Sequence, residues 1–133
     1  MKLLKTSKPE HAVLVSLRPT EARALRAALA EICFGLVIDN FSDVIGCPES
    51  QARLLFSKLD DLDLESEHVL AVERHDLDTL KNAQAVVLDR LGSAEYETRT
   101  GVNFADGQVL LRQLDRISWP EKPGAESGES GTA

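Results

Sequence analysis

A dense group of carboxylates lies near the middle of the sequence, at Asp60, Asp61, Asp63, Glu65 and Glu67. Such a group attracts cationic proteins and can cover a basic cleft, as immunity proteins and antitoxins do for nucleases. We therefore predict that these residues bind a basic protein partner of a toxin-like or nuclease-like kind. The alternative is a solvated acidic linker between two folded units. A calcium loop is not predicted, because the central glycine that it requires is missing.

Patterns typical of enzymes are missing from the sequence. His68 and His75 flank Glu73 and Asp76, but no two histidines have the spacing of a zinc-binding pair. The serines lack the GxSxG context of a hydrolase, and neither cysteine lies near a histidine in the sequence. We predict a non-enzymatic protein without a catalytic site, metal ion or cofactor. The alternative is a small enzyme or ligand-binding domain whose site lies between two halves of the chain.

The stretch 41–62 resembles a helix-turn-helix, with a short helix that ends in glycine, a tight turn and a second helix. In a DNA reader of this kind, the start of the second helix meets base edges and phosphates. The residues placed to do so are Gln51, Arg53 and Lys58, and Arg112 in the later part of the chain. Carboxylates at the same helix starts would face phosphate, and no basic stripe accompanies them. Nucleic-acid binding, on DNA or within a transcription complex, is therefore the alternative function.

The helices and strands that must position these residues are predicted from a repeat in the sequence. Comparison of the sequence with itself at an offset of 55 residues aligns Gly46 with Gly101 and, five residues earlier, Phe41 with Tyr96. The other identical pairs are Leu25/Leu80, Ala28/Ala83, Ala30/Ala85, Leu36/Leu91, Leu55/Leu110, Leu59/Leu114 and Asp60/Asp115. The alignment needs no insertion, and it predicts an internal duplication.

Each predicted half, 12–62 and 68–117, reads as β-α-α-α. Short apolar runs with β-branched residues begin the halves and predict strands, which we expect to pair. Apolar residues at helical spacing, followed by glycines, then predict three helices in each half, with Thr20, Asp76 and Asn103 as cap residues. The predicted strands are 12–17 and 68–73. The predicted first helices are 20–34 and 77–91, which Gly35 and Gly92 would end in a left-handed conformation, and the predicted short second helices are 40–45 and 95–100. The predicted fold is α+β and mostly helical: two tandem pseudo-symmetric halves share one core and a small two-stranded antiparallel sheet.

Composition limits the class of protein. The chain has 133 residues, of which 43% are hydrophobic and 28% charged, so a single compact domain over 1–119 is expected. The segment 120–133 is rich in Pro, Gly, Ser and Glu, and we predict a disordered tail there. The formal net charge of -7 favours basic partners over phosphate backbones. Two cysteines without a disulfide pattern, and no apolar run of membrane length, predict a bacterial cytoplasmic protein; the oligomeric state is left open.

Overall fold

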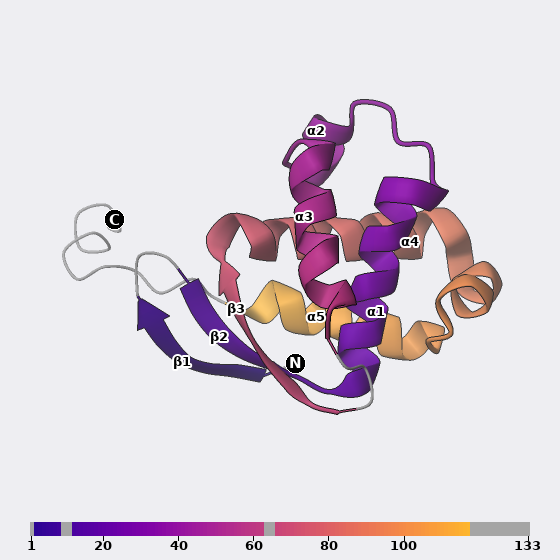
Figure 1. The fold of residues 1–133 in the computed structure, drawn as a ribbon. Helices are drawn as coiled ribbons and strands as arrows, with labels where there is room; N and C mark the ends of the chain where they lie inside the picture. The colour runs from indigo at the N-terminus through magenta and orange to yellow at the C-terminus, as the bar shows by residue number, and fades with distance from the viewer. Residues whose placement is uncertain (1, 9–11, 63–65, 118–133) are drawn as a thin grey trace, which may run out of the picture.

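The computed structural model describes residues 2–8, 12–62 and 66–117, and Figure 1 shows how their elements are arranged. The predicted tail 120–133, Asp63 and Glu65 lie outside the described residues. The elements, in chain order, are β1 (Lys2–Lys8), β2 (Ala12–Leu17), α1 (Pro19–Ala30), the π-helical turn η1 (Glu31–Gly35), α2 (Phe41–Ile45), α3 (Glu49–Asp60), β3 (His68–Glu73), α4 (Arg74–Thr100) and α5 (Phe104–Arg116). The prediction of a mostly helical α+β fold is confirmed.

The three strands form one antiparallel sheet in the order β1-β2-β3. The two predicted strands, β2 and β3, pair with each other as expected, and Val15 lies opposite Leu70. The prediction of only two strands is wrong in one respect, because β1 adds a third strand beside β2. The β1 sequence KLLKTSK lacks a regular apolar alternation and carries three lysines. Lysine is common on edge strands, where it discourages pairing with other chains, and this is the position that β1 occupies.

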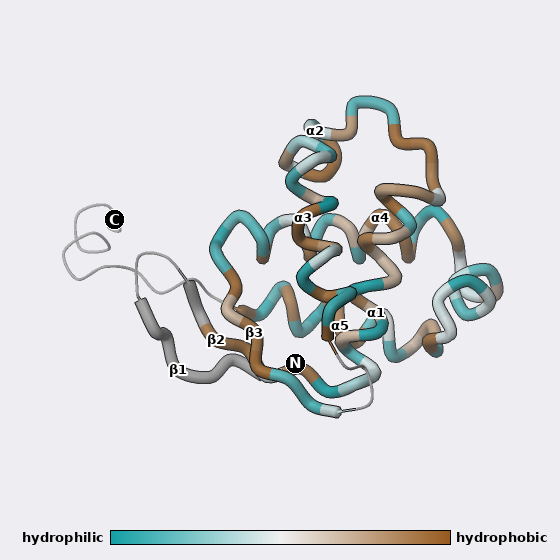
Figure 2. The backbone as a smooth tube through the Cα atoms, in the orientation of Figure 1, coloured by the Kyte–Doolittle hydropathy of each residue, from teal (hydrophilic) through white to brown (hydrophobic). Residues whose placement is uncertain are grey.

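The helices enclose a hydrophobic core. Helix α1 packs against α3 and α4, and α4 packs against α5 (Figure 1). In α1 the buried residues include Ala22, Leu25, Ala28 and Leu29, which the helical repeat places on one face. Figure 2 shows hydrophobic and hydrophilic segments alternating along the helices, as expected when one face of each is buried. Within the described residues, no helix has both the length and the apolar character to cross a membrane.

The helix starts agree with the sequence only in part. Asn103 caps α5 as predicted, since its side-chain oxygen accepts the backbone N–H of Ala105 at 2.9 Å. The helices α1 and α4 begin earlier than predicted, so Thr20 and Asp76 lie inside their first turns and are not cap residues. An acidic residue in a first turn is still favourable, because the helix dipole is positive there.

The predicted helix ends at Gly35 and Gly92 have different outcomes. Gly35 closes the π-helical turn and does not have a positive φ. Gly92 has φ 75° and ψ 177°, which lies outside the left-handed helical region. The helical backbone is interrupted at Gly92, so the two helices predicted over 77–100 are separated there as expected, although both carry the label α4.

The pattern of buried residues repeats along the chain at the 55-residue spacing of the sequence alignment. Every buried residue from Leu17 to Leu59 has a buried residue 55 positions later, as for Leu25 and Leu80. The helix starts follow the same spacing: α1 and α4 begin at residues 19 and 74, and α3 and α5 at residues 49 and 104. Val15 and Leu70, which face each other in the sheet, are separated by the same number of residues.

The two aromatic residues aligned in the sequence differ in their surroundings. Phe41 is half-buried at the edge of the core, whereas Tyr96 is fully buried. The Tyr96 ring packs edge-on against Phe104, with ring centroids 5.8 Å apart. Its hydroxyl accepts a hydrogen bond of 3.1 Å from Gln84 Nε2. The two rings therefore have dissimilar surroundings, and the expectation that they occupy equivalent places is wrong in this respect.

Gly46 and Gly101 end α2 and α4 with φ values of 98° and 74°, in the left-handed region. We predict that Gly101→Ala destabilises the fold by about 1–2 kcal/mol, because a Cβ strains this backbone conformation. A Cβ at Gly101 would meet no atom within 4 Å, so the loss would be conformational and not steric. Urea unfolding measures it, with Gly101→Asn as the matched control, since asparagine tolerates this conformation better. Equal losses for the two variants would contradict this explanation.

Candidate functional site

Two grooves open where α3 faces the start of α4 and where α5 faces the start of α1. The α3–α4 groove has a volume of about 670 Å³ and the α1–α5 groove about 370 Å³. The α3–α4 groove is lined by Ser50, Gln51, Leu54, Leu55, Ser57, Lys58, Asp61, Glu73, His75 and Asp76. The α1–α5 groove is lined by Arg18, Pro19, Thr20, Glu21, Ala24, Val102, Asp106, Val109, Leu110 and Gln113. Most of these lining positions correspond at the spacing of 55 residues.

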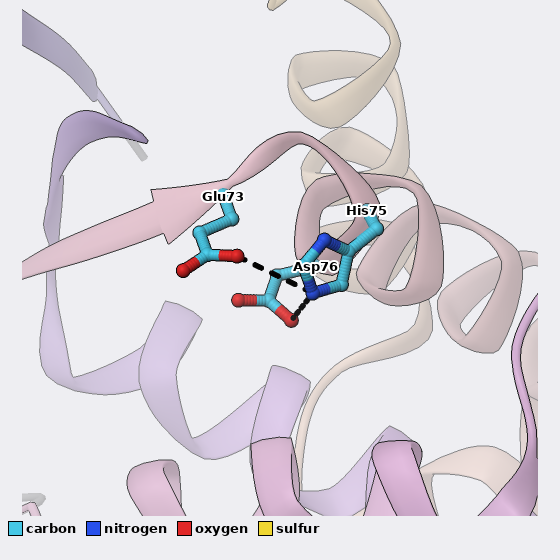
Figure 3. A group of neighbouring side chains, drawn as sticks. All are labelled: Glu73, His75 and Asp76. Atoms are coloured by element: carbon cyan, nitrogen blue, oxygen red, sulfur yellow. Dashed lines mark ion pairs between the residues drawn. The ribbon is translucent and has the colours of Figure 1, made fainter. Parts of the chain in front are cut away.

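Three polar side chains meet at the junction of β3 and α4 (Figure 3). Glu73 is the last residue of β3, and His75 and Asp76 lie in the first turn of α4. The imidazole Nε2 of His75 lies 3.5 Å from Glu73 Oε1 and 3.4 Å from Asp76 Oδ1. Asp76 is buried, whereas Glu73 and His75 are exposed. The strand and the helix thus direct two carboxylates toward one imidazole nitrogen.

The charges that line the α3–α4 groove are mostly negative. Asp61, Glu73 and Asp76 are acidic, and Lys58 is the permanent cation among the lining residues. Lys58 Nζ lies 3.9 Å from Asp76 Oδ2, and the lysine side chain is 54% exposed. Water screens a pair of this kind, so it contributes less than about 1 kcal/mol. The groove therefore presents carboxylates to the solvent beside an apolar residue, Leu54, which is itself exposed.

The predicted acidic cluster is divided by the fold. Asp60 faces α1 and forms an ion pair with Arg26, in which the nitrogen and oxygen are 2.7 Å apart. Asp61 lines the α3–α4 groove. Glu67 is exposed just before β3. Among the three members that the structure describes, Asp61 is thus the one that the fold brings to the other acidic residues of the groove.

The residues predicted for nucleic-acid contact are also separated. Gln51 and Lys58 line the α3–α4 groove, and Arg112 lies on α5 beside Asp115 in another hollow. Arg53 forms an ion pair of 2.7 Å with Glu49 on the same helix. Its guanidinium also lies over the ring of Phe34, 5.1 Å from the ring centroid. These cations do not form one basic surface.

The α1–α5 groove is lined by different polar residues. Glu21 is buried, and its carboxylate accepts the backbone N–H of Arg18 at 2.9 Å. The second carboxylate oxygen lies 3.4 Å from the Arg18 guanidinium. Arg18, Thr20 and Glu21 stand at the positions that correspond to Glu73, His75 and Asp76. The α1–α5 groove thus has an arginine–carboxylate pair where the α3–α4 groove has an imidazole and two carboxylates.

Both cysteines are buried and free, as predicted. Burial, with a smaller contribution from the negative charge of Glu49, raises the pKa of the Cys33 thiol to about 11. Cys47 accepts a hydrogen bond of 3.3 Å from Thr79 Oγ1. A thiol with a raised pKa stays protonated at neutral pH and is a poor nucleophile. Cys33 is therefore suited to packing and not to nucleophilic chemistry.

Sequence reasoning assigns no function to Glu73, His75 or Asp76. The available signal is that a histidine lies among two carboxylates over positions 73–76, a pattern that is common at protein surfaces. In the folded protein, the strand–helix junction directs these three side chains toward one another, and the sequence pattern alone does not specify those directions. No protein-family model matches the chain, and no curated protein or solved structure matches it.

Proposed function

We propose that this protein is a non-enzymatic binding module that receives a basic segment of a partner protein in the α3–α4 groove. The observation that supports the proposal is the gathering of Asp61, Glu73 and Asp76 around a groove with one lysine, Lys58. Carboxylates arranged in this way attract a cationic partner to the groove and fix its orientation there. They also disfavour an acidic competitor. A bacterial inhibitor of the immunity or antitoxin kind, acting in the cytoplasm on a toxin or nuclease, is the most concrete form of this proposal.

An apolar residue gives such a groove an anchor as well as charge. Leu54, on α3, is 68% exposed and lines the groove beside the carboxylates. Burying a leucine side chain in an interface contributes about 1.5–3 kcal/mol, more than an exposed ion pair does. The partner segment that fits combines lysine or arginine with an aliphatic side chain.

Nucleic-acid binding is less well supported. Two of its four candidate residues, Arg53 and Lys58, lie beside Glu49 and Asp76, so each would have to leave a carboxylate to reach a phosphate. The formal net charge of -7 opposes the approach of a polyanion. Salt-sensitive retention on a heparin column would contradict this ranking and favour the helix-turn-helix function.

We also propose that the two halves, 12–62 and 68–117, are copies of one β-α-α-α unit related by a pseudo-two-fold axis. Three observations at the same spacing support this: the buried positions, the helix starts and the facing of Val15 and Leu70. Under this proposal the two grooves are copies as well, and their polar lining residues have become different. The partner site is expected in the α3–α4 groove because its counterpart contains Arg18 in place of Glu73.

Charge reversal tests the function. We expect Asp61→Lys combined with Gln51→Lys to weaken binding of a fluorescein-labelled peptide, in which lysines flank a leucine, by at least tenfold. The reason is that reversing or adding two exposed charges near a cation costs on the order of 1 kcal/mol each, and about 1.4 kcal/mol is tenfold. Fluorescence anisotropy at low ionic strength measures the affinity.

The matched control is Asp89→Lys with Gln108→Lys, which makes the same change of charge in the hollow beside α5. This control is expected to keep most of the affinity of the original protein. Equal weakening by the two variants would mean that the peptide responds to net charge and not to the groove. Absence of peptide binding by the original protein would reject the proposed partner class.

A further inference from the structure

We propose that Glu73, His75 and Asp76 form a binding site for one Zn²⁺ ion in the α3–α4 groove. The three side chains offer one imidazole nitrogen and two carboxylate oxygens, and these donor atoms all lie within 4.8 Å of one another. Nitrogen and oxygen donors of this kind are typical ligands of zinc. Figure 3 shows them converging from the end of β3 and the first turn of α4.

The distances between donor atoms suit a tetrahedral ion. Zinc binds nitrogen and oxygen ligands at about 2.0–2.2 Å, so two ligands at neighbouring corners of the tetrahedron lie about 3.4 Å apart. His75 Nε2 lies 3.5 Å from Glu73 Oε1 and 3.4 Å from Asp76 Oδ1. Two of the three donor separations therefore have the length that a shared zinc ion requires. The third separation, between the Glu73 and Asp76 oxygens, is within 4.8 Å.

The supporting structure holds the least exposed ligand in place. The Asp76 side chain is 8% exposed and belongs to the first turn of a long helix, so few of its rotamers remain accessible. Lys58 approaches Asp76 at Oδ2, whereas His75 faces Oδ1. The oxygen that would bind zinc is thus not the one nearest the lysine. Binding sites built on strands and helices hold their ligands more accurately than sites built on loops.

The α1–α5 groove provides an internal comparison. At the corresponding positions it contains Arg18, Thr20 and Glu21, and the guanidinium of Arg18 lies 3.4 Å from the Glu21 carboxylate. An arginine is always protonated and cannot bind a metal ion. The donor set therefore belongs to one groove, although both grooves have an acidic residue in the first turn of a helix.

The chemistry of the donors selects the class of metal ion. Magnesium and calcium prefer oxygen ligands alone, and calcium takes about 6–8 of them. Imidazole together with carboxylates favours zinc among the common ions without redox chemistry. Three protein ligands leave one tetrahedral position open, as in zinc sites that bind water or a further ligand. That position is accessible from the α3–α4 groove, because all three ligands line it.

Titration of the purified protein with CoCl₂ tests the site without any partner, because Co²⁺ in a tetrahedral zinc site has intense visible absorption. We expect one equivalent of Co²⁺ to produce this absorption, and ZnCl₂ to abolish it by displacement. His75→Ala should weaken binding by roughly a hundredfold or more, since even the loss of a group that only orients a metal ligand costs about 10–100-fold. His68→Ala, which removes a histidine from β3, is the matched control and should bind as the original protein does.

Three results would overturn the proposal: no tetrahedral Co²⁺ spectrum at millimolar metal, an unchanged spectrum in His75→Ala, or an equal loss in His68→Ala. Glu73→Gln gives a second variant with little change of shape, and circular dichroism checks that each variant is folded. The peptide assay uses Asp61 and Gln51, which are not among the proposed ligands, and it is run with EDTA because a bound Zn²⁺ would offset the charge of Glu73 and Asp76. Failure of the metal site and failure of the partner site are therefore distinguishable.

Discussion

Replacement of Tyr96 by alanine is expected to destabilise the protein by about 3–5 kcal/mol, as removal of a buried aromatic ring generally does. Tyr96 is fully buried and packs against Phe104. Its removal also takes away the hydroxyl to which Gln84 donates. A domain of ordinary stability unfolds with about 5–15 kcal/mol, so the loss would be a large part of the total. Urea unfolding at neutral pH, followed by circular dichroism, measures it.

The matched control for this variant is Phe41→Ala, at the corresponding position of the first half. Phe41 is half-buried, so its removal leaves a smaller cavity and should cost clearly less than the removal of Tyr96. Similar losses at the two positions would show that the rings contribute equally, and they would contradict the difference in burial described above.

Replacement of Gly107 by alanine is expected to destabilise the protein by about 1–3 kcal/mol, the usual cost of adding a group to a packed core. A Cβ at this position would lie 2.6 Å from the Tyr96 hydroxyl oxygen and 2.8 Å from Cζ of the ring. The sign is informative, because in an exposed helix the same substitution would stabilise by about 1 kcal/mol. In the first half, the corresponding position is Ala52, where the aligned ring is that of the half-buried Phe41.

A double variant separates overcrowding from other effects of the substitution. In a Tyr96→Ala background, Gly107→Ala should cost less than it does alone, because the ring that it would meet is absent. The interaction free energy from this double-mutant cycle is expected to be roughly 1 kcal/mol or more, as for residues in contact. Additive losses would mean that Gly107 is required for a reason unrelated to Tyr96.

The sequence predicts the elements whose pattern is local. Leu25 and Leu80 recur with their apolar neighbours at helical spacing, and both are buried on helices. Strand β1 was beyond this reasoning, because its formation depends on the free edge of β2 and not on an apolar alternation of its own. The break at Gly92 was predictable, because a glycine after a helical run favours a positive φ, although its ψ of 177° differs from that of the expected left-handed cap.

The candidate site was less predictable than the fold. Asp61, Lys58 and Asp76 line one groove only because the fold brings the end of α3 near the start of α4, and no local pattern specifies that placement. Asp60 shows the converse, since a residue next to Asp61 in the sequence faces Arg26 on α1 instead. Neighbouring carboxylates on a helix point in different directions, so the acidic run in the sequence does not become one acidic surface.

Val15 and Leu70 lie opposite each other in the sheet, and this pairing has a consequence for assembly. A single unit of the proposed repeat would leave this edge of its strand unpaired, and it could satisfy the edge only by associating with a second copy. Joining two units in one chain makes that association intramolecular, so folding no longer depends on protein concentration. Under that proposal the two copies need not stay identical, so one groove can contain an imidazole and the other a guanidinium.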